Sequence, residues 1–243
     1  MGKIHVLLKK EELNEQRLDQ KIAVILDVLL ATSTIAAVLE AGAEAVIPVL
    51  NAEEAKQKAM NFEKESFIVA GEYEGRTIAG FHPPYPTELK QKATGKIVIL
   101  STTNGTVAIR KATRAKQIYT VSLLNTAAVS KRISENCENN TIIIVCSGSS
   151  GEFNVEDFYG AGCLIESLIS QDGHHFELTD AAYAAHRFYQ SYASLGEQLL
   201  KDSRIGKKLI EHGRDKELAY VAKKDLYSVV PFIKAGRIVS AND

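Results

Sequence analysis

The segment from Ser101 to Thr106 concentrates side chains that could bind an anion in this 243-residue chain. It reads Ser-Thr-Thr-Asn-Gly-Thr and follows residues 97–100, an apolar run whose length is typical of a buried strand. Ligands of open α/β sheets bind at the carboxyl ends of strands, and hydroxyl and backbone N–H donors suit phosphate or another oxyanion. A plain polar turn between a strand and a helix has the same composition, so the loop alone leaves both interpretations open.

Two further strand ends carry similar hydroxyl-rich loops. The predicted strand 21–26 ends at Asp27 and continues through Thr32-Ser-Thr34 into an Ala-rich helix. The predicted strand 141–145 leads into Cys146-Ser-Gly-Ser-Ser-Gly151 and then into another helix. A strand, a small polar loop and a helix, repeated three times, are typical of βαβ units.

Five acidic residues lie at or just after predicted strand ends: Asp27, Glu72, Glu152, Glu156 and Asp157. If the strands are parallel neighbours, these carboxylates converge on one edge, where carboxylates and phosphate oxygens together would bind Mg²⁺. Such a metal would polarise a phosphoryl oxygen and activate water. The alternatives are purely structural: Glu156 and Asp157 would only occupy the first turn of a helix, and Glu72 would be a turn residue. Asp27 is the stronger candidate, because an uncompensated charge at the end of an apolar strand is costly.

Several known phosphoryl-transfer motifs are absent from the sequence. It contains no P-loop, no Arg six positions after Cys146, no second acid two positions after Asp27, and no Arg-His-Gly. Cys146 has no basic neighbour in sequence to lower its pKa, so we expect a buried strand-end residue there. A mechanism that uses acids and hydroxyl-rich loops remains.

The composition limits compartment and partners. Lys and Arg number 29 against 30 Asp and Glu, which gives no support to nucleic-acid binding. No apolar run approaches the ~20 residues of a membrane span, and three cysteines form neither a disulfide framework nor a zinc pattern. We expect a cytoplasmic protein. A homodimer is compatible with the sequence, which carries no signal for oligomeric state.

The fold expected is a single three-layer α/β/α domain over residues 1–243, with a central, largely parallel or mixed sheet. A helical excursion near 179–213 is predicted to contain one long helix, 179–200, and a short one, 203–211. Residues 74–92 hold three of the five prolines and are predicted to be a connecting loop or a lid near the site. His174 and His175 are expected in an exposed loop.

In this order and spacing, motifs along most of the chain resemble the 2-phosphosulfolactate phosphatase family. The matching pieces are Ile25-Leu-Asp-Val-Leu29, Ala31-Thr-Ser-Thr-Ile35, Gly71-Glu72 with Arg76 and Gly80-Phe81, Ser101 to Thr106, Cys146-Ser-Gly148, Glu156-Asp157, Ala161-Gly162, Ser203-Arg-Ile-Gly206, Asp225 and Val230-Pro231. The resemblance implies an α/β/α fold and a Mg²⁺-dependent hydrolase that converts 2-phospho-3-sulfolactate to 3-sulfolactate and phosphate. The sequence departs from the family pattern at Leu30, where the family usually has arginine, and at His82-Pro-Pro-Tyr-Pro86.

Because Leu30 removes one cation, the expected substrate is 2-phospho-3-sulfolactate or a similar small acidic phosphate ester. Asp27, Glu156 and Asp157 are the predicted catalytic and metal-binding residues. The predicted substrate-binding residues are Thr32, Ser33, Thr34, Ser101, Thr102, Thr103, Asn104, Gly105, Thr106, Ser147, Gly148 and Arg204. The alternatives are a non-catalytic protein that binds an anionic phosphometabolite on the same fold, and a nucleotide-binding domain, for which the glycine signatures are missing.

Overall fold

The computed structural model describes residues 2–137, 139–171 and 176–241, which include eleven strands and ten α-helices. The strands are β1 Gly2–Leu7, β2 Ile22–Leu26, β3 Ala45–Val49, β4 Phe67–Tyr73, β5 Arg76–Thr77, β6 Ile97–Ser101, β7 Gln117–Val121, β8 Ile142–Cys146, β9 Phe176–Leu178, β10 Pro231–Lys234 and β11 Arg237–Ser240. The helices are α1 Ala31–Glu40, α2 Ala52–Ala59, α3 Pro86–Ala93, α4 Gly105–Lys111, α5 Thr126–Asn136, α6 Val155–Ile169, α7 Asp180–Tyr192, α8 Gly196–Asp202, α9 Arg204–Glu211 and α10 Asp215–Val221.

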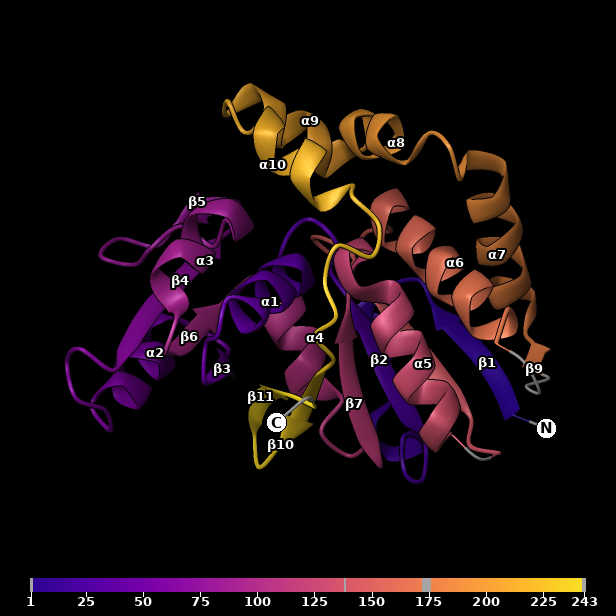
Figure 1. Cartoon of the computed structure of the whole chain (residues 1–243), viewed down its shortest axis with the longest axis horizontal. Helices are drawn as coiled ribbons and strands as arrows, with labels where there is room; N and C mark the ends of the chain where they lie inside the picture. Colours follow the sequence, from indigo (N-terminus) through magenta and orange to yellow (C-terminus); the bar gives the residue numbers. More distant parts are fainter. Residues whose placement is uncertain (1, 138, 172–175, 242–243) are drawn as a thin grey trace.

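The strands form one mixed sheet in the order β5-β4-β6-β3-β11-β10-β7-β2-β8-β1-β9. Strands β4, β6 and β3 are mutually parallel, and so are β7, β2, β8, β1 and β9. Between the two sets lies the hairpin β10–β11, antiparallel to β7 on one side and to β3 on the other (Figure 1). The two parallel sets therefore run in opposite senses across the sheet, which corrects the assumption that all site-bearing strands are parallel neighbours.

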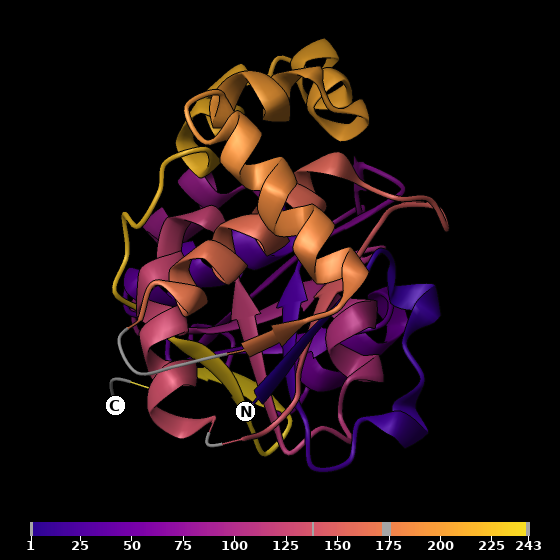
Figure 2. The ribbon, with the colours of Figure 1, turned by 90° about the vertical axis from the view of Figure 1, so that its right-hand side faces the viewer.

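Helices cover both faces of the sheet, which confirms the three-layer α/β/α fold. Strand β2 shows why: Ile22, Val24 and Leu26 enter one apolar cluster with α5, α6 and α7, and Ala23 and Ile25 enter a second with α1 and α4. A strand buried on both faces is a continuous apolar run, as the sequence of β2 is. Helices α8 to α10 lie together beyond the ends of the strands (Figures 1 and 2).

Three local predictions need correction. The predicted helix 179–200 is two helices: α7 ends at Tyr192 and α8 begins at Gly196, because glycine disfavours a helix interior. A Cβ on Gly196 would lie 2.6 Å from the Tyr159 hydroxyl, so the glycine permits close packing on α6. The proline-rich segment leads into helix α3, whose first residue is Pro86, the position at which proline is tolerated. Helix α10 was not predicted.

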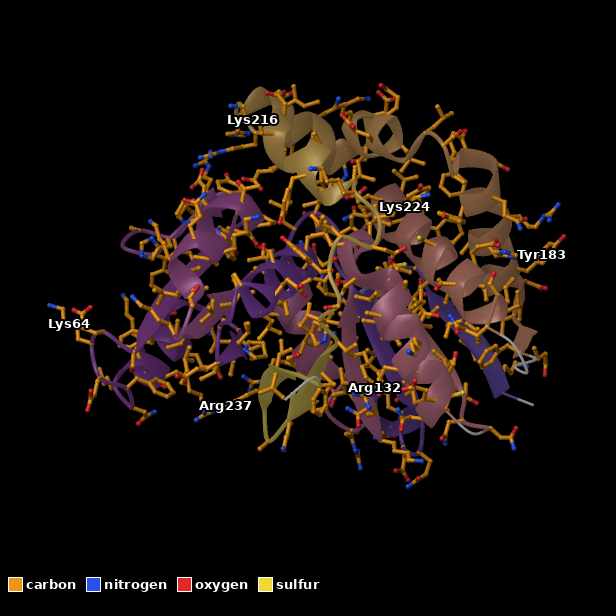
Figure 3. The ribbon with its side chains drawn as sticks, viewed as in Figure 1. Lys64, Arg132, Tyr183, Lys216, Lys224 and Arg237 are labelled. Atoms are coloured by element: carbon orange, nitrogen blue, oxygen red, sulfur yellow. The ribbon has the colours of Figure 1, made fainter. Side chains whose placement is uncertain are left out.

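His174 and His175 lie outside the described residues. Among the described residues, no helix is both long and apolar enough to cross a membrane. Labelled basic side chains such as Lys64, Lys216 and Arg237 project from separate outer parts of the molecule (Figure 3).

Candidate active site

A cavity of about 550 Å³ lies where the carboxyl ends of both parallel sets face helix α9. Its walls come from the loop after β2, the β4–β5 hairpin, the segment before α3, the loops after β6 and β8, and α9. Pro84 and Tyr85 belong to this wall, so the proline-rich segment does lie beside the candidate site. The two sets come together here through the loops that follow their strands: Gly105 after β6 approaches Asp27 after β2, and Asn104 accepts from Lys10 after β1.

Of the residues predicted to be catalytic, metal-binding or substrate-binding, four line the cavity: Asp27, Thr102, Thr103 and Asn104. The remaining ones lie behind the lining, and they are Thr32, Ser33, Thr34, Ser101, Gly105, Thr106, Ser147, Gly148, Glu156, Asp157 and Arg204. The lining also includes Glu72, which the sequence had left between a functional residue and a turn residue.

Asp27 is held by the first turn of α1 and by the start of α4. The hydroxyl of Thr32 donates to the main-chain oxygen of Asp27 at 2.9 Å and accepts from its N–H at 3.1 Å. A Cβ on Gly105 would lie 2.7 Å from Asp27 Oδ2 and 2.4 Å from the Ala31 Cβ. Glycine is therefore required at position 105 for the β6 loop to approach the Asp27 carboxylate.

The Glu72 carboxylate is fixed by the β6 loop and by its own turn. Oε1 accepts from the Thr103 N–H at 2.7 Å, and Oε2 accepts from the Gly75 N–H at 2.7 Å and the Thr103 hydroxyl at 3.1 Å. These three donors hold the carboxylate in one orientation at the cavity wall. Thr103 thus orients Glu72, in addition to lining the cavity itself.

Asp157 and Glu156 form a buried layer behind Asp27. The Asp157 carboxylate accepts from the Val28 N–H at 2.9 Å and the Gly148 N–H at 3.1 Å, and so ties the loops after β2 and β8 together. Glu156 is 1 % exposed, and its Oε1 has no hydrogen-bond partner among the described residues. Both residues lie in the first turn of α6, as expected if their role were only to stabilise the helix N-terminus. A residue with that role alone is usually exposed, whereas these two side chains are buried.

The clustering raises the pKa values of three carboxyl groups. Burial, and next the nearby Glu72 carboxylate, raise the pKa of Asp27 from 3.8 to about 7. Burial and the Asp27 and Glu156 charges raise the pKa of Asp157, and burial raises that of Glu156. A site with this excess of buried acid is stabilised by a cation or by protons.

The hydroxyls at the start of α1 bond to main-chain oxygens. Ser33 donates to the Val28 oxygen at 2.9 Å, and Thr34 donates to the Pro84 oxygen at 2.7 Å. All three side chains of Thr32, Ser33 and Thr34 are fully buried. Because these hydroxyls are buried and donate to main-chain oxygens, they shape the Asp27 loop and the cavity wall and do not face a ligand.

Three other predicted groups lie close to the acids without lining the cavity. The Ser147 hydroxyl is buried and has no hydrogen-bond partner among the described residues. Arg204 donates to the Ser149 oxygen at 3.1 Å and to Asn154 Oδ1 at 3.2 Å, and its charge opposes the pKa rise of Glu156. Burial raises the pKa of Cys146 well above its usual range, which fits a buried strand-end residue and not a nucleophile.

Sequence reasoning gave no role to Lys10, Lys208 or His212, and Arg76 entered only as one of the pieces that carry the family resemblance. Lys10 follows β1, is 7 % exposed, and donates to Asn104 Oδ1 at 2.8 Å, while its charge opposes the pKa rise of Asp27. Its position just after the apolar run Val6-Leu-Leu8, next to Lys9, was the available signal. Arg76, Lys208 and His212 line the cavity, and only the fold brings them there.

Comparison with known proteins accords with this geometry. The sequence profile described as 2-phosphosulpholactate phosphatase matches residues 7–236. The chain belongs to the 2-phosphosulfolactate phosphatase family. Membership in the 2-phosphosulfolactate phosphatase family makes the chain a phosphatase-type enzyme, a phosphoric monoester hydrolase.

Relatives cover the chain almost from end to end. A protein of Clostridium acetobutylicum named "Probable 2-phosphosulfolactate phosphatase" is 35% identical over 98% of this chain and 100% of its own length. Proteins of the same name from Thermotoga maritima (37% identity, 89% and 90% coverage) and Clostridium perfringens (38% identity, 97% and 95% coverage) are similar. The match therefore includes every element that builds the 2-phosphosulfolactate phosphatase cavity.

Proposed function

We propose that the chain hydrolyses the phosphate ester of 2-phospho-3-sulfolactate, or of a closely similar small acidic organophosphate, with Mg²⁺ as cofactor. The observation that carries the proposal is the pair Asp27 and Glu72 on the wall of a 550 Å³ cavity beside the Thr102–Asn104 loop. The family match over residues 7–236 supports the phosphatase part of the proposal.

The donor set fits magnesium. Among the described residues, no group of three or more His, Cys, Asp or Glu side chains forms a ready-made metal site. Mg²⁺ does not need one, since it is usually held by one or two carboxylates together with substrate phosphate oxygens and water. Asp27 and Glu72 would hold it, and the buried carboxyl groups of Asp157 and Glu156 lie close to Asp27.

When bound, Mg²⁺ would neutralise charge on the phosphoryl oxygens and polarise the phosphorus centre. The protein's own residues fix the positions of the two carboxylates. Thr103 keeps Glu72 in place, Gly105 lets the loop reach Asp27, and Asp157 fixes the two loops on either side of Asp27. Because the pKa of Asp27 is about 7, cation binding near neutral pH displaces a proton from it.

The test is release of inorganic phosphate from 2-phosphosulfolactate by the purified protein, with Mg²⁺ and with excess EDTA. We expect turnover of roughly 1–10³ s⁻¹ with Mg²⁺ and little with EDTA. Calorimetric binding of the ester without phosphate release would instead favour the non-catalytic binding protein. That alternative is motivated by Leu30, which lines the cavity where the family usually has arginine.

A further inference from the structure

A second, basic part of the cavity has no role in the chemistry described so far. Arg76 of β5 and Lys208 and His212 of α9 line the same cavity as Asp27 and Glu72. We call Arg76 and Lys208 the basic pair. Arg76 lies on β5, which pairs with the Glu72 strand β4, and Lys208 comes from α9, so the cavity wall carries both signs of charge.

Among the residues that the structure describes, no partner neutralises the charges of the basic pair. In the described parts of the chain, no hydrogen bond or ion pair involves the Arg76 guanidinium or the Lys208 ammonium, although Glu74 and Glu211 also line the cavity. Two other arginines, by contrast, have partners within the protein. Arg110 pairs with Glu54 at 2.6 Å, and Arg204 donates to Ser149 and Asn154. Unpaired cations in a concave site suit an anionic ligand group.

Helix α9 is held rigidly enough to present such a group. The Ser203 hydroxyl caps it by accepting from the Gly206 N–H at 2.9 Å. A Cβ on Gly206 would lie 1.8 Å from the Leu200 oxygen, so only glycine lets α9 pack this closely on α8. Ile205, Lys208, Leu209 and His212 follow the i, i+3, i+4, i+7 spacing of one helix face, and this face lines the cavity.

The far end of the helical segment is docked on α3 and on the Tyr85 residue that precedes it. The Glu217 carboxylate is 3 % exposed and accepts from the Thr87 N–H at 3.3 Å and from the Thr87 hydroxyl. Arg214 pairs with Glu88 at 2.5 Å and stacks on the Tyr85 ring at 4.1 Å. These contacts keep the α9 face over the cavity, and the position of Lys208 is thereby set by the fold.

We propose that Arg76 and Lys208 bind the second acidic group of the substrate, a carboxylate or a sulfonate, and so select organophosphates that carry one. The inference rests on the proposed phosphatase function and adds its specificity determinant. It also shows how a chain with Leu30 accepts an acidic ester, because the cations come from β5 and α9 instead. Arg204, which the sequence nominated for this contact, donates to Ser149 and Asn154 behind the cavity wall.

The test compares kcat/KM for three esters: 2-phosphosulfolactate, 2-phospholactate, which lacks the sulfonate, and glycerol 2-phosphate, which lacks both acidic groups. In Arg76→Gln and in Lys208→Met, we expect the ratio of kcat/KM for 2-phosphosulfolactate to that for glycerol 2-phosphate to fall roughly 10-fold to 100-fold. Lys208→Arg should restore most of the ratio, because it keeps the charge. The 2-phospholactate arm identifies whether the carboxylate or the sulfonate makes the contact.

Lys207→Met is the matched control, since Lys207 lies on the same helix but does not line the cavity. A double variant Arg76→Gln/Lys208→Met with the wild-type ratio of the two esters overturns the inference. If wild type hydrolyses none of the esters, the phosphatase proposal fails instead. Calorimetric binding of the product 3-sulfolactate then tests the basic pair alone: weaker binding in the double variant supports it, and equal binding overturns it.

Discussion

Two hydroxyl-rich segments, Thr32–Thr34 and Thr102–Asn104, have similar composition and similar places after a strand, yet they meet different surroundings. The first is fully buried, and its hydroxyls donate to the main-chain oxygens of Asp27, Val28 and Pro84. The second lines the cavity, where Thr103 fixes Glu72. Hydroxyl-rich sequence at a strand end is therefore compatible with two roles: bonding to the main chain to shape a loop, and lining a binding cavity.

The largest effect is expected at Asp27, whose main chain is held by the first segment and whose side chain faces the cavity. Asp27→Asn keeps the Thr32 contacts but removes the carboxylate, so phosphate release should fall roughly 100-fold or more. The fold should persist, because the change removes one of several crowded buried charges. Steady-state phosphate release and thermal unfolding measure both, and full activity in the variant contradicts the assigned role.

A smaller effect separates the two segments directly. Thr103→Val should reduce kcat/KM roughly 10-fold, because the Glu72 carboxylate loses the hydroxyl and the Glu74 N–H loses its acceptor. Ser33→Ala should change kcat/KM less than threefold and cost about 1 kcal/mol in the free energy of unfolding, because the Val28 oxygen loses one donor. Urea unfolding and kinetics on both variants check this. If Thr103→Val and Ser33→Ala lost equal amounts of kcat/KM, the proposed difference between a residue that lines the cavity and one that shapes a loop would be wrong.

A last effect, on stability rather than on catalysis, concerns the pH dependence of unfolding without metal. The pKa of Asp27 rises from 3.8 to about 7 on folding, so the folded state binds more protons than the unfolded state over that range. The free energy of unfolding should therefore fall by about 1–4 kcal/mol as the pH rises from 4 to 8 in EDTA. Mg²⁺ should recover part of this at pH 8, and Asp27→Asn should flatten the curve. Identical pH curves for wild type and variant would contradict the raised pKa.

Much of the fold was predictable because periodicity and caps act locally. The strands at 22–26, 97–101 and 142–146, and the Asn51 cap of α2, which accepts from the Glu54 N–H at 2.9 Å, follow from adjacent residues. Asp27 and the Thr102–Asn104 loop were also found this way. What failed was non-local: the opposed strand sets depend on a hairpin near residue 235, and the basic pair reaches the cavity only through the docking of α9.

The β10–β11 hairpin is the last part of the sheet in the sequence, and it joins the two parallel sets. Strands β3 and β7 do not pair with each other, so the sheet is continuous only once residues 231–240 lie between them. Asp27 and Glu72 belong to opposite sets and are both synthesised far earlier. We therefore expect the two sets to form as separate β layers, and the sheet that carries both carboxylates to become continuous only when residues 231–240 pair with β3 and β7.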